Sequence, residues 1–146
     1  MNRSVRLEYR FNASHSISGA RENEHVHTFT LTAVAGYADS TKEQETDEVL
    51  RNFVKSFENR YLNELEYFEG VYPSIEEMGD RFYETLHDEL MSKGIELMSV
   101  EISDSPMTSY SVSDRIMGTC LNDNISTKNY SMLLKYRDLV LGEEES

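Results

Sequence analysis

The sequence predicts an α+β domain in which two strands, two helices and two further strands follow one another along the chain. Two observations predict this order: apolar and polar residues alternate strictly in segments at both ends of the region, and apolar residues recur at helical spacing between them. A chain of 146 residues is long enough for one domain with a substantial core. We expect that domain to span residues 1–112, with a C-terminal extension, residues 113–146, packed on it.

The first two strands are expected at residues 4–15 and about 25–37. Apolar residues take every second position of the first segment, and His15 ends that face. The second segment begins with His25 and His27 and alternates apolar residues with threonines. Because the connection between the two segments is short, we expect an antiparallel pair.

Two amphipathic helices are expected to follow. Apolar residues at helical spacing place the first at about 46–58. The second begins after Pro73, where Ser74 and Glu77 have the spacing of a capping box, and Gly94 is placed to end it.

Alternation returns at the end of the predicted domain. It predicts a strand leading through Ile102 to Asp104, a break at Pro106, and a short strand near 108–113 that completes a second hairpin. In the extension, residues 129–141 are expected to form a helix.

Composition narrows the possible functions. The formal net charge is −13, and lysines and arginines do not cluster, which argues against nucleic-acid binding. No apolar run is long enough for a membrane span. The single cysteine, Cys120, excludes an internal disulfide, fits a reducing cytoplasm, and is interpreted as a small buried residue. We therefore expect a cytoplasmic protein that binds neither nucleic acid nor membrane.

Three of the four histidines point to a metal site. Residues two apart in a strand project from one face, so His25 and His27 can bind one ion, and His15 can supply a third nitrogen from the neighbouring strand. Three imidazoles suit Zn²⁺ and leave its fourth position open, as in catalytic sites. For His25 and His27 considered without His15, the alternative is that they are two partly exposed side chains that bind no metal.

The same residues resemble the zinc site of the 6-pyruvoyltetrahydropterin synthase and 6-carboxytetrahydropterin synthase family. Further matches follow in the family's order over about residues 4–112. The matching segments are Phe11-x-Ala13-Ser14-His15, His25-x-His27, Glu58-Asn59-Arg60-Tyr61-Leu62-Asn63, Pro73-Ser74-Ile75-Glu76 and Val100-x-Ile102-x-Asp104-Ser105-Pro106.

The resemblance implies the T-fold, in which trimers close a β-barrel and two trimers stack as a hexamer, with sites between subunits. It also implies a small-molecule substrate: zinc on His15, His25 and His27 holds oxygens of a pterin side chain, and a carboxylate on the later strand anchors the ring. In this sequence the resemblance gives three candidate substrate-binding residues: Asp104 as the anchor, Ser105 next to it, and Asn59 in the segment that matches the family's dyad.

The departures from the family's pattern concern its proton-transfer residues. The usual cysteine before the histidine pair is missing, and a variant branch has a glutamate where this chain has Glu22; Glu24 is the local competitor for that role. The family's aspartate–histidine dyad is Glu58-Asn59 here, and an amide cannot act as a general base.

Three functions are compatible with these residues. The first is a zinc-dependent lyase or synthase that acts on a pterin or a related small molecule. The second is a repurposed member that uses the same zinc site on a non-pterin substrate in a specialised biosynthetic pathway. The third is a non-catalytic binding or scaffold protein of the same fold.

Overall fold

In a computed structural model of the chain, which describes residues 3–113, the predicted ββααββ order is confirmed. Its elements are β1 (Arg3–His15), β2 (His25–Tyr37), α1 (Lys42–Lys55), α2 (Ile75–Met91), β3 (Glu96–Ser105) and β4 (Thr108–Ser113), with short 3-10 turns at Arg21–Asn23, Leu62–Glu64 and Glu66–Phe68. Apart from Ser113, the predicted extension at 113–146 lies outside the described residues. The helix expected at 129–141 and Cys120 are part of it. No helix within residues 3–113 is long and apolar enough to cross a membrane.

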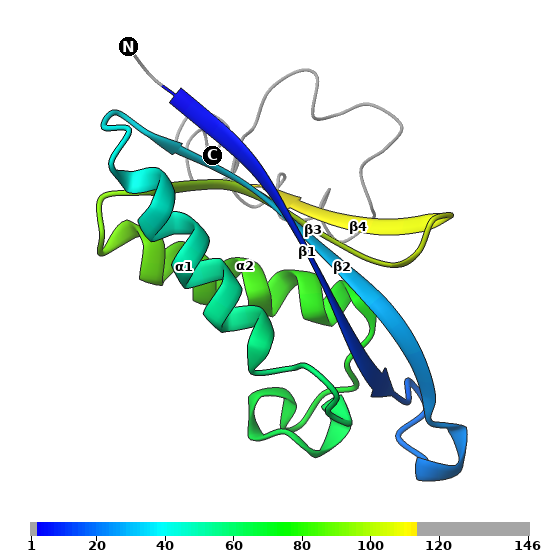
Figure 1. Ribbon diagram of the computed structural model, residues 1–146. Coiled ribbons are helices and arrows are strands. Elements are labelled where there is room, and N and C mark those ends of the chain that lie inside the picture. The colour runs from blue at the N-terminus through cyan, green and yellow to red at the C-terminus, as the bar shows by residue number, and fades with distance from the viewer. Residues whose placement is uncertain (1–2, 114–146) are drawn as a thin grey trace, which may run out of the picture.

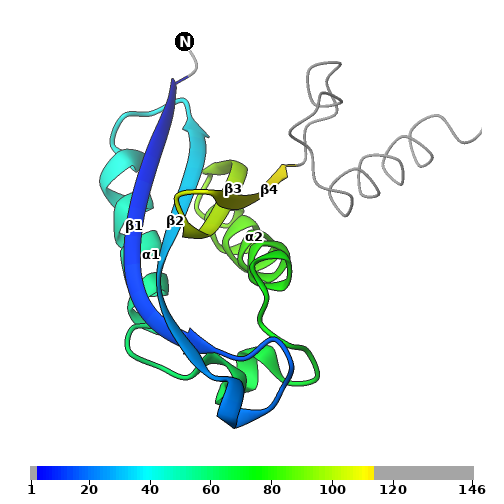
Figure 2. The same ribbon diagram turned by 90° about the vertical axis from the view of Figure 1, so that its right-hand side faces the viewer.

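The strands form one antiparallel sheet in the order β1-β2-β3-β4. Both helices lie on one face of it, and the β1–β2 hairpin continues past the helices to the loop at its end (Figures 1 and 2). The core lies between that face and the helices, where Phe29, Leu31 and Val100 are fully buried. The opposite face carries polar side chains such as Thr28, Thr30 and Glu101, as the alternation requires.

The first helix begins four residues and ends three residues earlier than its apolar spacing predicts. Its first turn is polar, but Glu43 and Glu45 are favourable there because the helix dipole places positive charge at the N-terminus. Thr46 is fully buried and donates its hydroxyl to the Lys42 carbonyl at 2.7 Å. Phe57 is buried but lies beyond the helix, after Ser56.

The second helix confirms its predicted N-terminus. Ser74 caps it by accepting a hydrogen bond from the Glu77 backbone N–H at 3.2 Å. The helix also packs very closely on β4: a Cβ on Gly79 would lie 2.6 Å from the Tyr110 ring, while the Tyr110 hydroxyl donates to Asp80 at 2.8 Å. A glycine is therefore required at this crossing.

Candidate metal centre

The β1–β2 register brings the three predicted histidines together. His15 pairs directly with His25, and His27 lies two residues further along β2 on the same face. One ligand atom from each of the three lies within 4.8 Å of the other two. His15 is buried, His27 is half-buried and His25 is exposed. The cluster could therefore hold a metal ion and is open on the His25 side.

Backbone carbonyls determine which ring nitrogen two of these histidines offer. Nδ1 of His15 lies 2.6 Å from the Pro73 carbonyl oxygen, and Nδ1 of His25 lies 3.1 Å from that of Asn23. A carbonyl only accepts hydrogen bonds, so each Nδ1 carries the proton and each Nε2 keeps its lone pair. This is how histidine ligands are commonly oriented at metal sites.

The Nε2 atom of His15 supports a metal in the cluster. It is buried, and within residues 3–113 it has no hydrogen-bond partner. A buried polar atom without a partner is costly, and a lone pair that faces two other imidazoles matches what a zinc ion requires. The donor set therefore fits the metal that the spacing predicts.

The surroundings of His15 favour the neutral form that a ligand needs. Burial lowers the pKa of His15, and the neighbouring His25 and His27 act in the same direction. The hydrogen bond to Pro73 and the charge of Asp104 oppose this shift. Because the net direction is downward, no proton has to leave His15 at neutral pH before a metal binds.

The two candidate catalytic carboxylates differ in their surroundings. Glu24 accepts hydrogen bonds from the Ser14 hydroxyl and from Arg21 Nε, the latter at 2.9 Å. The Ser14 bond is the main reason that the pKa of Glu24 is lowered. Glu22 is exposed on the 3-10 turn before β2 and makes no hydrogen bond or ion pair to any described residue. Of the two, Glu22 is thus the carboxylate without a partner among the described residues.

The structure does not bring the three candidate substrate-binding residues to one place within a single chain. Asp104 and Ser105 line a cavity of about 530 Å³ on the polar face of the sheet, and the charge of Asp104 is the smallest of the influences on the pKa of His15. Asn59 lines a different cavity of about 430 Å³, next to Glu24. Its φ of 60° is left-handed, a conformation that asparagine tolerates well.

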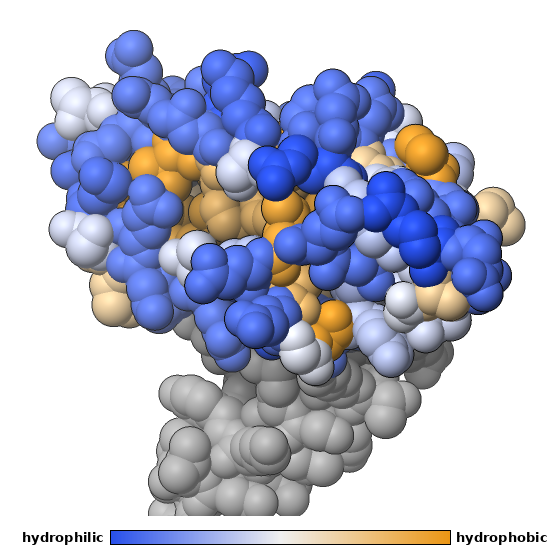
Figure 3. All heavy atoms as spheres, turned by 90° about the horizontal axis from the view of Figure 1, so that it is seen from below, coloured by the Kyte–Doolittle hydropathy of each residue, from blue (hydrophilic) through white to orange (hydrophobic). Residues whose placement is uncertain are grey.

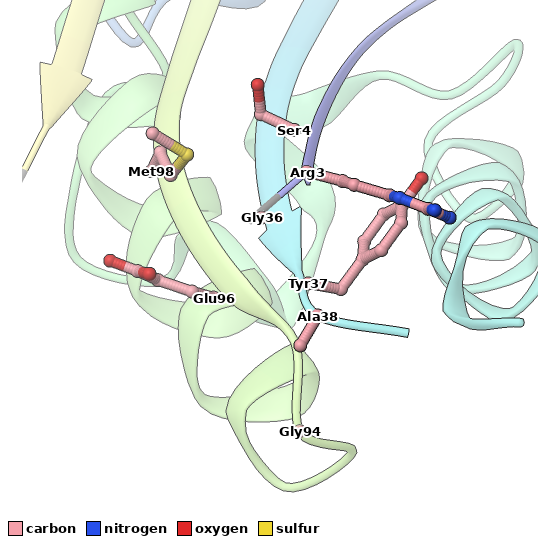
Figure 4. Close-up of a pocket in the computed structure, with 8 residues that line it drawn as sticks. All are labelled: Arg3, Ser4, Gly36, Tyr37, Ala38, Gly94, Glu96 and Met98. Atoms are coloured by element: carbon pink, nitrogen blue, oxygen red, sulfur yellow. The ribbon is translucent and has the colours of Figure 1, made fainter. Parts of the chain in front are cut away.

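The surface at this end of the molecule is mainly polar, with apolar residues in interrupted strips (Figure 3). At the opposite end, a cavity of about 430 Å³ is lined by Arg3, Tyr37 and Glu96 among others. Arg3 and Tyr37 lie side by side there and point away from Glu96 (Figure 4). Among the described residues, only the histidine cluster combines three nitrogen ligands of this kind.

Sequence reasoning missed the groups that support the histidines. They are the carbonyls of Pro73 and Asn23 and the side chain of Asn63, which hydrogen bonds to the backbone of Ser16. Backbone acceptors have no sequence pattern of their own. Asn63, however, closes the Leu62-Asn63 pair of a matching segment, and that position could have been given a role.

Fold and site together define a class: an α+β protein with a four-stranded antiparallel sheet that carries a candidate three-histidine metal centre on its helix-covered face. The family described as 6-pyruvoyl tetrahydropterin synthase matches residues 4–115. The chain belongs to this family, and its sheet with two helices is the T-fold. The family resemblance and the fold class predicted from the sequence are therefore confirmed. No curated protein matches the chain.

Solved structures support the fold. The 6-pyruvoyl tetrahydropterin synthase of Caenorhabditis elegans aligns with a TM-score of 0.65 at 14% identity, over 79% of this chain and 97% of its own. An uncharacterised protein from Wolinella succinogenes aligns with a TM-score of 0.62 at 12% identity, over 79% of this chain and 99% of its own. A catalytic-residue mutant of the Plasmodium vivax 6-pyruvoyltetrahydropterin synthase aligns with a TM-score of 0.55 at 14% identity, over 80% of this chain and 99% of its own. At these identities the likeness concerns the fold.

Proposed function

We propose that the protein is a zinc-dependent lyase or synthase that acts on a pterin or a related small molecule. One observation carries the proposal: His15, His25 and His27 converge with Nε2 of His15 buried and unpartnered among the described residues. Family membership adds the substrate class. His15, His25 and His27 would hold the zinc, which when bound supplies a Lewis acid for oxygens of the substrate side chain.

In this proposal the proton is moved by Glu22. Its carboxylate has no partner among the described residues, whereas Glu24 is held by Ser14 and Arg21. Positive charge at the metal favours the ionised carboxylate, which is the form that accepts a proton. The P. vivax structure supports a glutamate in such a role, because it is described as a mutant of a catalytic glutamate.

Asp104, with Ser105, would anchor the ring of the substrate. This role is supported by the position of Asp104 in the matching segment and by its charge, which is one of the influences on the pKa of His15. The histidine cluster is open on the side of exposed His25. We propose that a second copy of the chain closes that side in a trimer or hexamer, and that Asn59 contributes to the completed site.

The experiment measures zinc in the purified full-length chain and then turnover of dihydroneopterin triphosphate. We expect zinc to bind in a one-to-one ratio, and its removal with a chelator to abolish turnover. Glu22→Gln should lower turnover by roughly 10²–10⁴-fold, the usual contribution of a general base, without changing zinc content.

The matched control is Glu69→Gln, which changes an exposed glutamate in the connection before α2. It should leave both zinc content and turnover unchanged. A chain that binds no zinc, or a Glu22→Gln variant as active as the control, would contradict the proposal.

One observation favours a repurposed site as the second candidate. Asn59 stands at the histidine position of the family's dyad, and its amide cannot act as a general acid or base there. On this hypothesis zinc is kept but the substrate is not a pterin. Crystals soaked with a pterin and with small acids or ketones would distinguish the two, since only the first candidate predicts a pterin ring at Asp104.

A further inference from the structure

The side chain of Asn63 forms two hydrogen bonds to the backbone of Ser16, the residue that follows the buried His15. Its side-chain oxygen accepts from the Ser16 backbone N–H at 2.9 Å, and its side-chain nitrogen donates to the Ser16 carbonyl at 2.7 Å. Ser16 is fully buried and directly follows His15. One amide therefore satisfies both backbone groups of a residue 47 positions away.

Other residues of the segment 61–73 also contact the loop between β1 and β2. Glu64 pairs with Arg21, whose guanidinium lies 4.1 Å from the centre of the Tyr61 ring. The Tyr72 ring lies so close to Gly19 that a Cβ there would be 2.7 Å from it. Since Gly19 also has a φ of +82°, this contact requires glycine.

The Pro73 carbonyl at the end of that segment accepts the Nδ1 proton of His15 at 2.6 Å. His15 is thus held at two points by one segment. Its ring is oriented through Pro73, and its backbone is fixed through the neighbouring Ser16 and Asn63.

We infer that Asn63 is a positioning residue for the metal ligand His15, acting through the backbone of Ser16. The inference rests on the proposed zinc site. Without Asn63, two buried backbone groups of Ser16 lose their partner, and the chain at His15 gains freedom that metal binding must remove again. Asparagine suits the position because one planar amide both donates and accepts; aspartate keeps only the acceptor, and alanine keeps neither.

The test compares variants of the full-length chain by zinc affinity, measured against a competing chelator, and by the visible spectrum of the Co²⁺-substituted protein. Asn63→Ala should weaken zinc binding by about tenfold or more, the loss typical when groups that orient a ligand are removed, and should alter the Co²⁺ spectrum. Asn63→Asp, which retains the acceptor for Ser16, should lose less affinity.

Tyr67→Phe is the matched control. The Tyr67 hydroxyl lies in the same segment and hydrogen bonds to the Arg81 carbonyl at 2.9 Å and to Thr85 at 2.7 Å, on the α2 side. Its loss should lower the unfolding temperature of the metal-free chain without changing zinc affinity or the Co²⁺ spectrum.

An Asn63→Ala variant with the affinity and spectrum of the unmodified chain overturns the inference, and so does an equal loss in Tyr67→Phe. If Asn63→Ala does not fold, Asn63→Asp carries the same comparison. An unmodified chain that binds no zinc overturns the proposed function and this role with it.

Discussion

Two stretches of β2 lie on the same face of the same strand and differ in content. From Phe29 to Ala35 that face is apolar and almost completely buried under the helices. At the other end it continues as His27, half-buried, and His25, exposed. The cluster is therefore an extension of the core past the helices. The free energy of unfolding should depend on the first stretch and metal binding on the second. A substitution in one stretch should hardly affect the property that depends on the other.

The largest effect is expected from Leu31→Ala in the apolar stretch. Leu31 is fully buried, and truncating such a side chain typically costs about 2–5 kcal/mol through lost burial and the cavity that remains. Urea unfolding of the metal-free chain measures this loss. Zinc affinity of the folded variant should stay close to that of the unmodified chain, and a parallel loss would show that the two stretches are not separable.

His25→Ala should have the opposite effect. Removing one of three ligands should weaken zinc binding by more than about 100-fold, the upper range for loss of a group that merely orients a ligand. Because His25 is exposed, stability of the metal-free chain should change by no more than about 0.5 kcal/mol.

Val26→Ala is the control for that variant, since Val26 is the next residue, points to the other face and is 72% exposed. It should change neither the zinc affinity nor the urea midpoint. If Val26→Ala weakens zinc binding as much as His25→Ala, loss of the imidazole is not the cause.

The smallest effect concerns the carboxylate beside the cluster. The hydrogen bond from Ser14, and then Arg21, lowers the pKa of Glu24 below its ordinary value of 4.5. The folded chain therefore takes up this proton less readily than the unfolded chain. The stability that Glu24 contributes is present above pH 4.5 and is lost as the pH falls through the lowered pKa.

Glu24→Gln should accordingly make the urea midpoint of the metal-free chain less sensitive to acidification below pH 4.5. Glu69→Gln, outside this network, should keep the full sensitivity. Identical pH profiles for the two variants would mean that the contacts of Glu24 do not contribute to stability in solution.

Most of the fold follows from periodicity, and the less periodic parts do not. The strand beginning at His25 was predicted with its observed bounds because alternation has a fixed relation to the faces of a sheet. The first helix was misplaced because its polar first turn has no apolar spacing, although Glu43 and Glu45 suit a helix start.

The candidate site divides in the same way. The three histidines could be grouped from sequence because strand pairing turns a spacing of two into a shared face. The hydrogen-bond acceptor of His15 could not be predicted from sequence. It is the backbone carbonyl of Pro73, 58 residues away, and every residue type has a backbone carbonyl. The difference between Glu22 and Glu24 likewise depends on which of them reaches Ser14 and Arg21.

The graded exposure of the three histidines also has a kinetic consequence. His15 is only 2% exposed and is held by Pro73, whereas His25 lies at the surface. In a single chain, an ion held by all three would therefore be released from exposed His25 before buried His15. The buried imidazole would then govern how long an ion stays, and the exposed one how quickly a competing chelator begins to remove it.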